Sequence, residues 1–197
     1  MKKFIYVIAL FTSVMQAQVG IGTTNPTAKL EIDASTDAIP ALEIVPRTTA
    51  PTGTASGQIS IMDGSLYVYD ATRAKWLSSE TMVFPFGKNG SVIAGDYLQY
   101  ARVEQQNSGA KVLQNATIVG IAAEASGGNP TKGFDIIIKT GGTTTTVSTT
   151  SFSLTGSTYL NPTANINLSA GDYISIQTRG GTDVNNPTVT LYVKWRK

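Results

Sequence analysis

The chain has 197 residues, a formal net charge of +2, and neither histidine nor cysteine. The lack of His excludes a Ser-His-Asp triad and a His-ligated zinc site, and the lack of Cys excludes thiol nucleophiles, disulfides and thiolate metal sites. The 13 acidic residues form no calcium-loop pattern and no pair that indicates catalysis. We therefore expect no enzyme activity, no cofactor and no metal, and the weak net charge argues against a nucleic-acid partner.

Residues 1–17 have the layout of a secretory signal peptide. Met1-Lys2-Lys3 is a positive head, an apolar run follows from Phe4 to Met15, and the small residue Ala17 precedes Gln18. The run is shorter than the roughly 20 apolar residues that span a bilayer. We expect a secreted or cell-surface protein without a membrane span. The alternatives are a buried first strand or an anchor in a larger assembly such as a virion.

The segment "QVGIGTTNPTAKLEI", residues 18–32, contains two glycines that resemble the start of a dinucleotide-binding loop. In that motif a third glycine opens a helix that binds the pyrophosphate. Here Asn25 stands at the third position and Pro26 follows it, and Lys29 to Ile32 alternates as a strand does. The segment therefore predicts a glycine-containing turn between short strands.

A β-hairpin is the clearest local prediction, with "GQISIM" and "SLYVYD" joined at Asp63-Gly64. Its aliphatic residues alternate and form one face, which contains Ile59, Ile61, Leu66 and Val68. An isolated two-stranded unit is marginal in water. Three chains wound around a common axis would bury this face and also pair the strand edges.

Residues 18–80 resemble a known group of fibres. "VGIGTTNPTAKLEI" is similar to the N-terminal repeat unit of exported fibre proteins of the Bacteroidetes group and of phage tail fibres. "SGQISIMDGSLYVYDATRAKWLSSE" is similar to the hairpin unit that often follows it. The resemblance implies a homotrimeric β-stalk and transfers no catalytic residue.

A boundary is expected within residues 81–91, where Pro85, Gly87 and Asn89-Gly90 interrupt the pattern. We thus predict a β-stalk with the hairpin at 18–83 and a head domain at 84–197. The strands expected in the head are residues 97–104, 117–125, 134–138, 152–154, 166–168, 174–176 and 189–195. The Thr tract at 143–150 is expected to be an exposed strand.

Eight or so strands in a little over 100 residues fit a jelly-roll sandwich. With "NINLSAGDYISIQTRG" and a final "VTLYVKW" strand, the region resembles trimeric heads of the complement and tumour-necrosis-factor type. We predict an all-β chain, a short trimeric β-stalk followed by a jelly-roll head, with Ile174, Ile176, Val189, Leu191 and Val193 in its core. The basic cluster Lys194, Arg196 and Lys197 is expected to be a solvated tail.

Candidate ligand-binding residues lie in the head. Tyr100, Tyr159 and Tyr192 are candidates for stacking on sugars. The loop "QTRGGTDVNNP", residues 177–187, contributes polar side chains, although a plain turn is the alternative reading. The favoured set is Tyr159, Arg179, Asp183, Asn185 and Asn186.

Three functional hypotheses follow from the sequence. The first is a non-enzymatic homotrimeric surface or secreted fibre with a head for adhesion to a glycan or protein. The second is a phage tail-fibre or virion spike component for binding a host receptor, and the third is a secreted carbohydrate-active enzyme. The signal-peptide layout favours the first over the second.

Overall fold

The computed structural model describes residues 19–21, 23–25, 27–36, 38–104, 109–126, 131–140 and 145–197. These residues form strands, turns and bends without a helix, so the all-β prediction is confirmed. None of them belongs to a helix long and apolar enough to cross a membrane. The predicted signal peptide at 1–17 lies outside the described residues.

The chain divides into two compact units, Met1–Val45 and Pro46–Lys197. In the first, β1 (Val19–Ile21) and β2 (Leu30–Ile32) pair in parallel, in line with the short strands predicted there. The carboxylate of Glu31 accepts hydrogen bonds from the backbone N–H and the hydroxyl of Thr27, which hold the connecting turn. The apolar side chains of both strands stay largely exposed.

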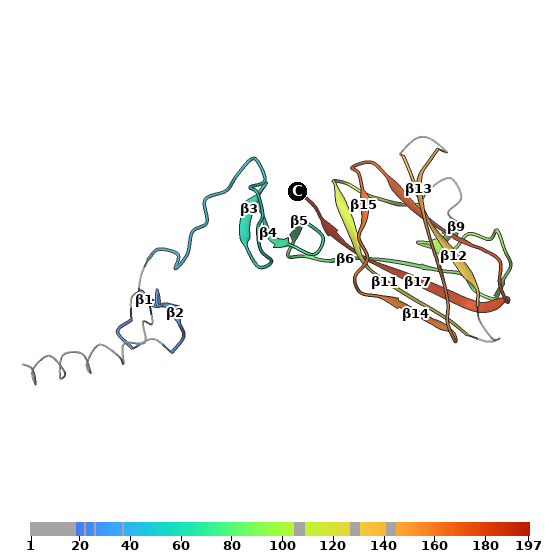
Figure 1. Cartoon of the computed structure of the whole chain (residues 1–197), viewed down its shortest axis with the longest axis horizontal. Helices are drawn as coiled ribbons and strands as arrows, with labels where there is room; N and C mark the ends of the chain where they lie inside the picture. Colours follow the sequence, from blue (N-terminus) through green and yellow to red (C-terminus); the bar gives the residue numbers. More distant parts are fainter. Residues whose placement is uncertain are drawn as a thin grey trace, which may run out of the picture. The chain divides into compact units, whose positions relative to one another are not determined.

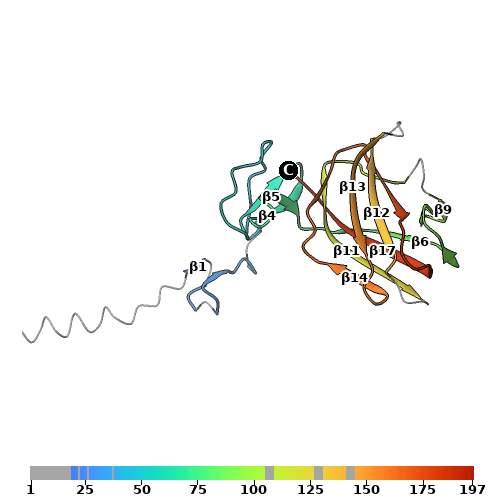
Figure 2. The same ribbon diagram turned by 45° about the vertical axis from the view of Figure 1, so that its right-hand side comes forward.

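Most of the second unit consists of two sheets that face each other across one hydrophobic core, and we call them the sandwich (Figures 1 and 2). Neighbouring strands in both sheets are antiparallel. The four-stranded sheet has the order β10 (Ala110–Lys111), β16 (Tyr173–Thr178), β12 (Gly133–Lys139) and β13 (Thr146–Ser153). The larger sheet has the order β14 (Thr158–Asn161), β11 (Ala116–Ser126), β17 (Val184–Trp195), β6 (Met82–Gly87), β8 (Gln99–Tyr100) and β9 (Val103–Glu104), with β15 (Ile166–Leu168) beside β11 and β7 (Ser91–Val92) beside β17.

The core is built by alternate side chains of both sheets. Ile174 and Ile176 of β16 and Val189, Leu191 and Val193 of β17 are each 0% exposed. All five were predicted to be core residues, and the prediction is confirmed. Burying each such side chain contributes about 1.5 to 3 kcal/mol, so this alternation is the main source of the sandwich's stability.

The structure differs from two of the sequence predictions for residues 81–104. Residues 81–91 were expected to contain a domain boundary, but β6 lies within them and pairs with β17 of the sandwich, with Pro85 opposite Thr190. Proline is tolerated because β8 pairs with β6 only at Gly87, so no ladder bond is needed on the other side. The expected single strand over 97–104 is instead a hairpin, since Ala101 and Arg102 have φ of 52° and 68° and turn β8 into β9.

A three-stranded sheet precedes the sandwich in the same unit. It consists of β3 (Ile59–Met62), β4 (Ser65–Asp70) and β5 (Lys75–Ser78). The predicted turn is confirmed, because Asp63 and Gly64 both have positive φ and link Met62 to Ser65 as a two-residue hairpin loop does. The chain therefore divides after Val45, whereas the sequence grouped residues 18–83 as a stalk.

The buried face of this small sheet is the opposite of the one expected from its aliphatic residues. Met62, Tyr67 and Trp76 are buried, and Trp195 from the end of β17 packs against them. On the other face, Ile59 is 52% exposed and Leu66 38% exposed. Because aromatic side chains bury the largest areas, they decide which face turns inward.

We predict that Trp195→Ala lowers the free energy of unfolding by about 2 to 3 kcal/mol, since the half-buried ring packs against both apolar clusters. Thr188→Ala, at an exposed position of the same strand, is the matched control and should change it little. Denaturant titration measures both. A Trp195→Ala variant as stable as the control would show that Trp195 does not link the two sheets.

Candidate functional site

The predicted loop residues Arg179 and Asp183 form ion pairs within the sandwich. Nε of Arg179 lies 3.0 Å from Oδ1 of Asp135 on β12. Nζ of Lys132 lies 2.8 Å from Oδ1 of Asp183, and the Lys132 side chain is fully buried. The loop is therefore attached to the start of β12 by two charge pairs, one of which neutralises a buried cation.

Asn185 and Asn186 form hydrogen bonds at an irregular part of β17. Asn186 has a φ of 50°, its N–H donates to the Gly90 carbonyl at 2.9 Å, and its Oδ1 accepts from the Gly90 N–H at 2.7 Å. The Asn185 carbonyl accepts from the Ser126 hydroxyl at 3.1 Å, beside a register shift between β11 and β17. These bonds favour the alternative in which residues 177–187 are a plain turn.

Tyr159 does not join the other four predicted residues. Its ring stacks on Phe152 at 4.6 Å between centroids, and Phe152 stacks on Phe134 at 5.5 Å in the core. Tyr100 likewise packs against Phe84 and Phe86. Of the three tyrosines considered for sugar stacking, Tyr192 is the most exposed. The five predicted residues therefore do not form one surface.

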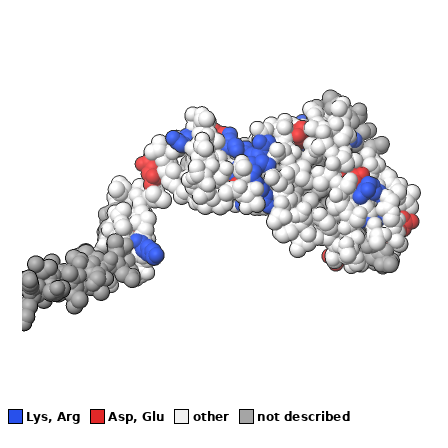
Figure 3. Space-filling model, in the orientation of Figure 1, with Lys and Arg blue, Asp and Glu red and all other residues white. Residues whose placement is uncertain are grey.

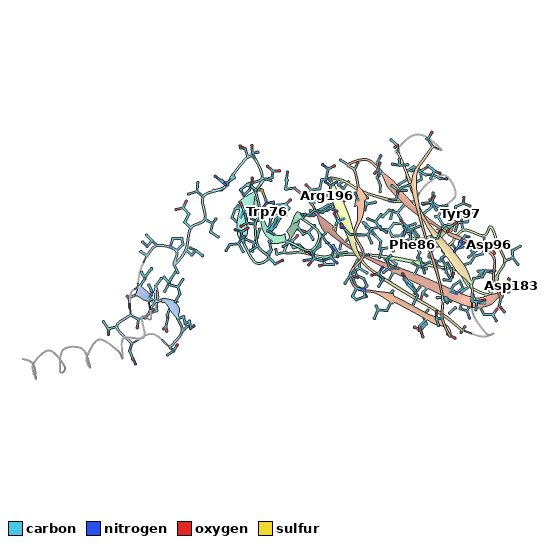
Figure 4. All side chains as sticks on the ribbon, in the orientation of Figure 1. Trp76, Phe86, Asp96, Tyr97, Asp183 and Arg196 are labelled. Atoms are coloured by element: carbon cyan, nitrogen blue, oxygen red, sulfur yellow. The ribbon has the colours of Figure 1, made fainter. Side chains whose placement is uncertain are left out.

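Basic side chains gather instead at the opposite end of the sandwich. Figure 3 shows Lys and Arg in a band where the three-stranded sheet meets the larger sheet, and Figure 4 places Arg196 there and Asp183 at the far end. We define the basic cluster as Arg73, Lys75, Lys194 and Arg196, all of them partly buried. The prediction of a solvated tail is thus wrong for Lys194 and Arg196.

Arg73, in the turn between β4 and β5, attaches this turn to the larger sheet. Its guanidinium pairs with Asp70 at 2.5 Å and donates to the carbonyls of Ala164, Val119 and Pro162 at 2.9, 3.0 and 3.2 Å. The planar group with five N–H donors suits this set of acceptors. Burial acts to raise the pKa of Asp70, but hydrogen bonds from Arg73 and Thr72 outweigh it and lower the pKa.

The other three cations of the cluster bond only to neutral oxygens among the described residues. Lys75 donates to the side-chain oxygens of Asn165 and Asn167 on the β15 side. Lys194 donates to the Ser78 and Ser79 carbonyls at 3.0 and 3.3 Å. The guanidinium of Arg196 donates to the Ala116 and Leu168 carbonyls at the long distances of 3.4 and 3.3 Å.

The cluster has an excess of positive charge. Burial, together with the charges of Arg196 and Arg73, lowers the pKa of Lys75. Two like charges about 4 Å apart in water repel by about 1 kcal/mol, and by more when partly buried. The carboxylates nearby are already paired, Asp70 with Arg73 and Asp63 with Lys197. The three remaining cations therefore attract anions.

One of these cations, Lys194, belongs to a row of polar side chains that crosses the larger sheet. Asn167, Thr117 and Lys194 are direct neighbours across β15, β11 and β17. Thr117 is fully buried, and its hydroxyl has no hydrogen-bond partner within the described part of the chain. Leaving such a group unsatisfied costs about 1 to 3 kcal/mol, which makes it unusual in a folded protein.

A cleft opens beside the row. Its volume is about 300 Å³, at the lower end for small-molecule sites. Its lining consists of Val68, Tyr69, Asp70, Arg73, Leu77, Ser78, Val119, Pro162 and Lys194. Asp70 and Arg73 neutralise each other, so Lys194 is the cation of this lining that can attract an anionic group.

The residues of this site were not identified from the sequence. The sequence features that point to this site are two pairs of basic residues with the same spacing, Arg73-x-Lys75 and Lys194-x-Arg196. Two basic residues separated by one position place positive charge at one point of the chain, so each pair predicts a local cationic spot. Nothing in either pair indicates that the folded chain brings them together.

No protein-family model matches the chain, and neither does any curated protein or solved structure. Within the described ranges, no three His, Cys, Asp or Glu side chains are grouped so that they could hold a metal ion. The basic cluster and its cleft are therefore interpreted from their own chemistry.

We predict that Asp70→Asn destabilises the protein at neutral pH but not in strong acid. Because the folded-state pKa of Asp70 is lowered below the ordinary 3.8, its stabilisation is fully present above that value and is lost as the pH falls through the folded-state pKa. Thermal unfolding at pH 7 and in strong acid, below the folded-state pKa of Asp70, measures the difference from the unmodified protein. Glu80→Gln, at an exposed position, is the control. A difference that stays constant with pH would contradict the Asp70–Arg73 pairing.

Proposed function

We propose that the protein is a non-enzymatic homotrimeric fibre protein, secreted or on the cell surface, whose sandwich is a head that binds a glycan or protein. The observation that carries the proposal is the aliphatic face of the three-stranded sheet. Ile59 and Leu66 are directly exposed on it, and Ile61 and Val68 are only partly covered.

Association with further copies of the chain would bury this face. Each Å² of apolar surface removed from water contributes about 25 cal/mol, and contiguous apolar patches on soluble proteins usually mark contact surfaces. In the first unit, taken by itself, Val19, Ile21 and Leu30 are each more than half exposed. Both units thus carry strands whose apolar side chains one chain leaves uncovered, as the resemblance to trimeric stalks implies.

The strand order of the sandwich supports the jelly-roll head. Eight successive strands are counted here: β6, β10, β11, β12, β13, the β14–β15 pair, β16 and β17. The first, β6, pairs with the last, β17, and β10 pairs with β16. Inside these pairs, β11 pairs with β14 and β15, and β12 pairs with β13. This nesting is what two Greek keys give in a jelly roll. The resemblance to trimeric heads therefore agrees with the connectivity.

The outer face of the larger sheet offers the head its own surface for contact between chains. Val83, Leu160 and Tyr192 are 50%, 73% and 39% exposed on it. A hollow of about 290 Å³ lies between Leu160 and Tyr192 above Gly120. A side chain at position 120 would crowd the Tyr192 ring, so glycine leaves this face open.

We predict that light scattering finds three times the mass of one chain. Ile59→Lys/Leu66→Lys should weaken the association, because it places two cations on the aliphatic face. Val147→Lys/Leu113→Lys is the matched control, since both residues are exposed apolar residues elsewhere on the unit. A folded, single-chain mass for the unmodified protein at micromolar concentration would contradict the proposal.

We also predict that the intact trimer binds cells or glycan arrays about a hundredfold more tightly than the dissociated Ile59→Lys/Leu66→Lys variant, because linked weak sites gain effective concentration. Surface binding assays measure both forms side by side. Equal binding would remove avidity from the proposal, and turnover of any glycan would overturn the non-enzymatic assignment.

A further inference from the structure

We propose that the basic cluster and its cleft bind the sulfate or carboxylate group of an acidic polysaccharide. The inference rests on the proposed binding role of the head and specifies the ligand class and the place where it binds. The site lies at the junction with the three-stranded sheet, away from the loop at 177–187 (Figure 4).

The three cations that lack a carboxylate partner among the described residues keep N–H donors that no described residue uses. An ammonium group has three, and Lys75 and Lys194 each use two of them. A guanidinium has five, and Arg196 uses two in long hydrogen bonds. An oxyanion bound by these side chains would therefore accept charge-assisted hydrogen bonds from the unused donors.

The side chains are close enough to act together. Lys75 bonds to Asn167, and the register places Asn167, Thr117 and Lys194 side by side. Directly opposed residues in a sheet have Cβ atoms about 4.5 to 5.5 Å apart. Arg196 lies near enough to lower the pKa of Lys75.

The unpaired hydroxyl of Thr117 is a second and independent sign of a ligand. It is fully buried within the polar row, between Asn167 and Lys194. Because the hydroxyl is closed off from solvent in this structure, an oxyanion would reach it only when the Lys75 and Lys194 side chains move apart, and would then provide an acceptor through a charge-assisted bond.

The lining favours a sugar-borne anion. Tyr69 and Pro162 line the cleft together with Lys194, and a partly apolar wall suits the C–H face of a sugar ring. A nucleic-acid site would require a longer basic stripe, and the chain's net charge is only +2.

The test measures binding of the full-length protein to immobilised dextran sulfate, polygalacturonate and neutral dextran by biolayer interferometry. We expect binding to one or both acidic polymers, none to dextran, and a loss of at least about tenfold in Lys75→Gln/Lys194→Gln. The two acidic polymers distinguish sulfate from carboxylate. Poly(U) RNA and anionic lipid vesicles are parallel probes, and tighter binding to either would overturn the polysaccharide assignment.

The matched control is Arg102→Gln/Lys111→Gln, which removes two positive charges at exposed positions away from the cluster. It should bind within about twofold of the unmodified protein. An equal loss in both double variants would overturn the site, because net charge alone would then explain binding. No binding to either acidic polymer would overturn it as well.

Thr117→Val tests the buried hydroxyl separately. Because the hydroxyl has no partner among the described residues, its removal should leave the unfolding temperature unchanged or higher, while binding of the acidic polymer weakens about threefold or more. Unchanged binding would exclude Thr117 from the site. Light scattering on every variant reports the trimer independently, so a failed ligand proposal is distinguishable from a failed fibre proposal.

Discussion

Strand β17 is the element on which the rest of the second unit depends. Its 12 residues pair with β11 along one edge and with β6 and β7 along the other, and its inward side chains are at the centre of the core. The same strand ends at the three-stranded sheet, where Trp195 enters the small aromatic cluster and its N–H donates to the Ser78 hydroxyl. One strand therefore stabilises the sandwich and also fixes the position of the sheet before it.

The aromatic contact of β17 determines which surfaces remain exposed. Tyr67 and Trp76 turn toward Trp195, and Nε1 of Trp76 donates to the Pro51 carbonyl at 2.7 Å. Because a strand alternates, Ile59 and Leu66 then lie on the other face and are exposed, whereas Leu77, opposite Val68 on that face, is buried. The contact between Trp195 and the three-stranded sheet also brings Arg73, in the turn, and Lys75, at the start of β5, close to Lys194 and Arg196. The proposed contact between chains and the proposed anion site thus have a common structural cause.

Much of the fold follows from local patterns in the sequence. The alternation of Val189, Leu191 and Val193 predicted a buried strand, and Asp63-Gly64 predicted a tight turn, because both depend on neighbouring residues. The inward face of the hairpin did not follow, since it depends on Trp195, which lies far away in the chain. Pro85 was read as an interruption, whereas the partial pairing of β8 leaves room for it.

The candidate site was predicted less well than the fold. Polar residues in the 177–187 loop indicated ligand binding, but Arg179, Asp183 and Asn186 form ion pairs and hydrogen bonds that hold the loop. The basic cluster arises from two segments separated by more than a hundred positions in the sequence. Only their pairing through β5, β11, β15 and β17 brings the cations together, so short-range patterns cannot reveal them.

The central claim is that the exposed aliphatic face of the three-stranded sheet is covered by other copies of the chain. Because the native chain has no cysteine, a nitroxide on Leu66→Cys reports that face alone, and a nitroxide on Val147→Cys serves as the control. The account predicts an immobilised label whose spectrum is broadened by labels on neighbouring chains, with the broadening removed by dilution with unlabelled chains before assembly. A mobile, unbroadened spectrum at position 66, the same as at position 147, would contradict it.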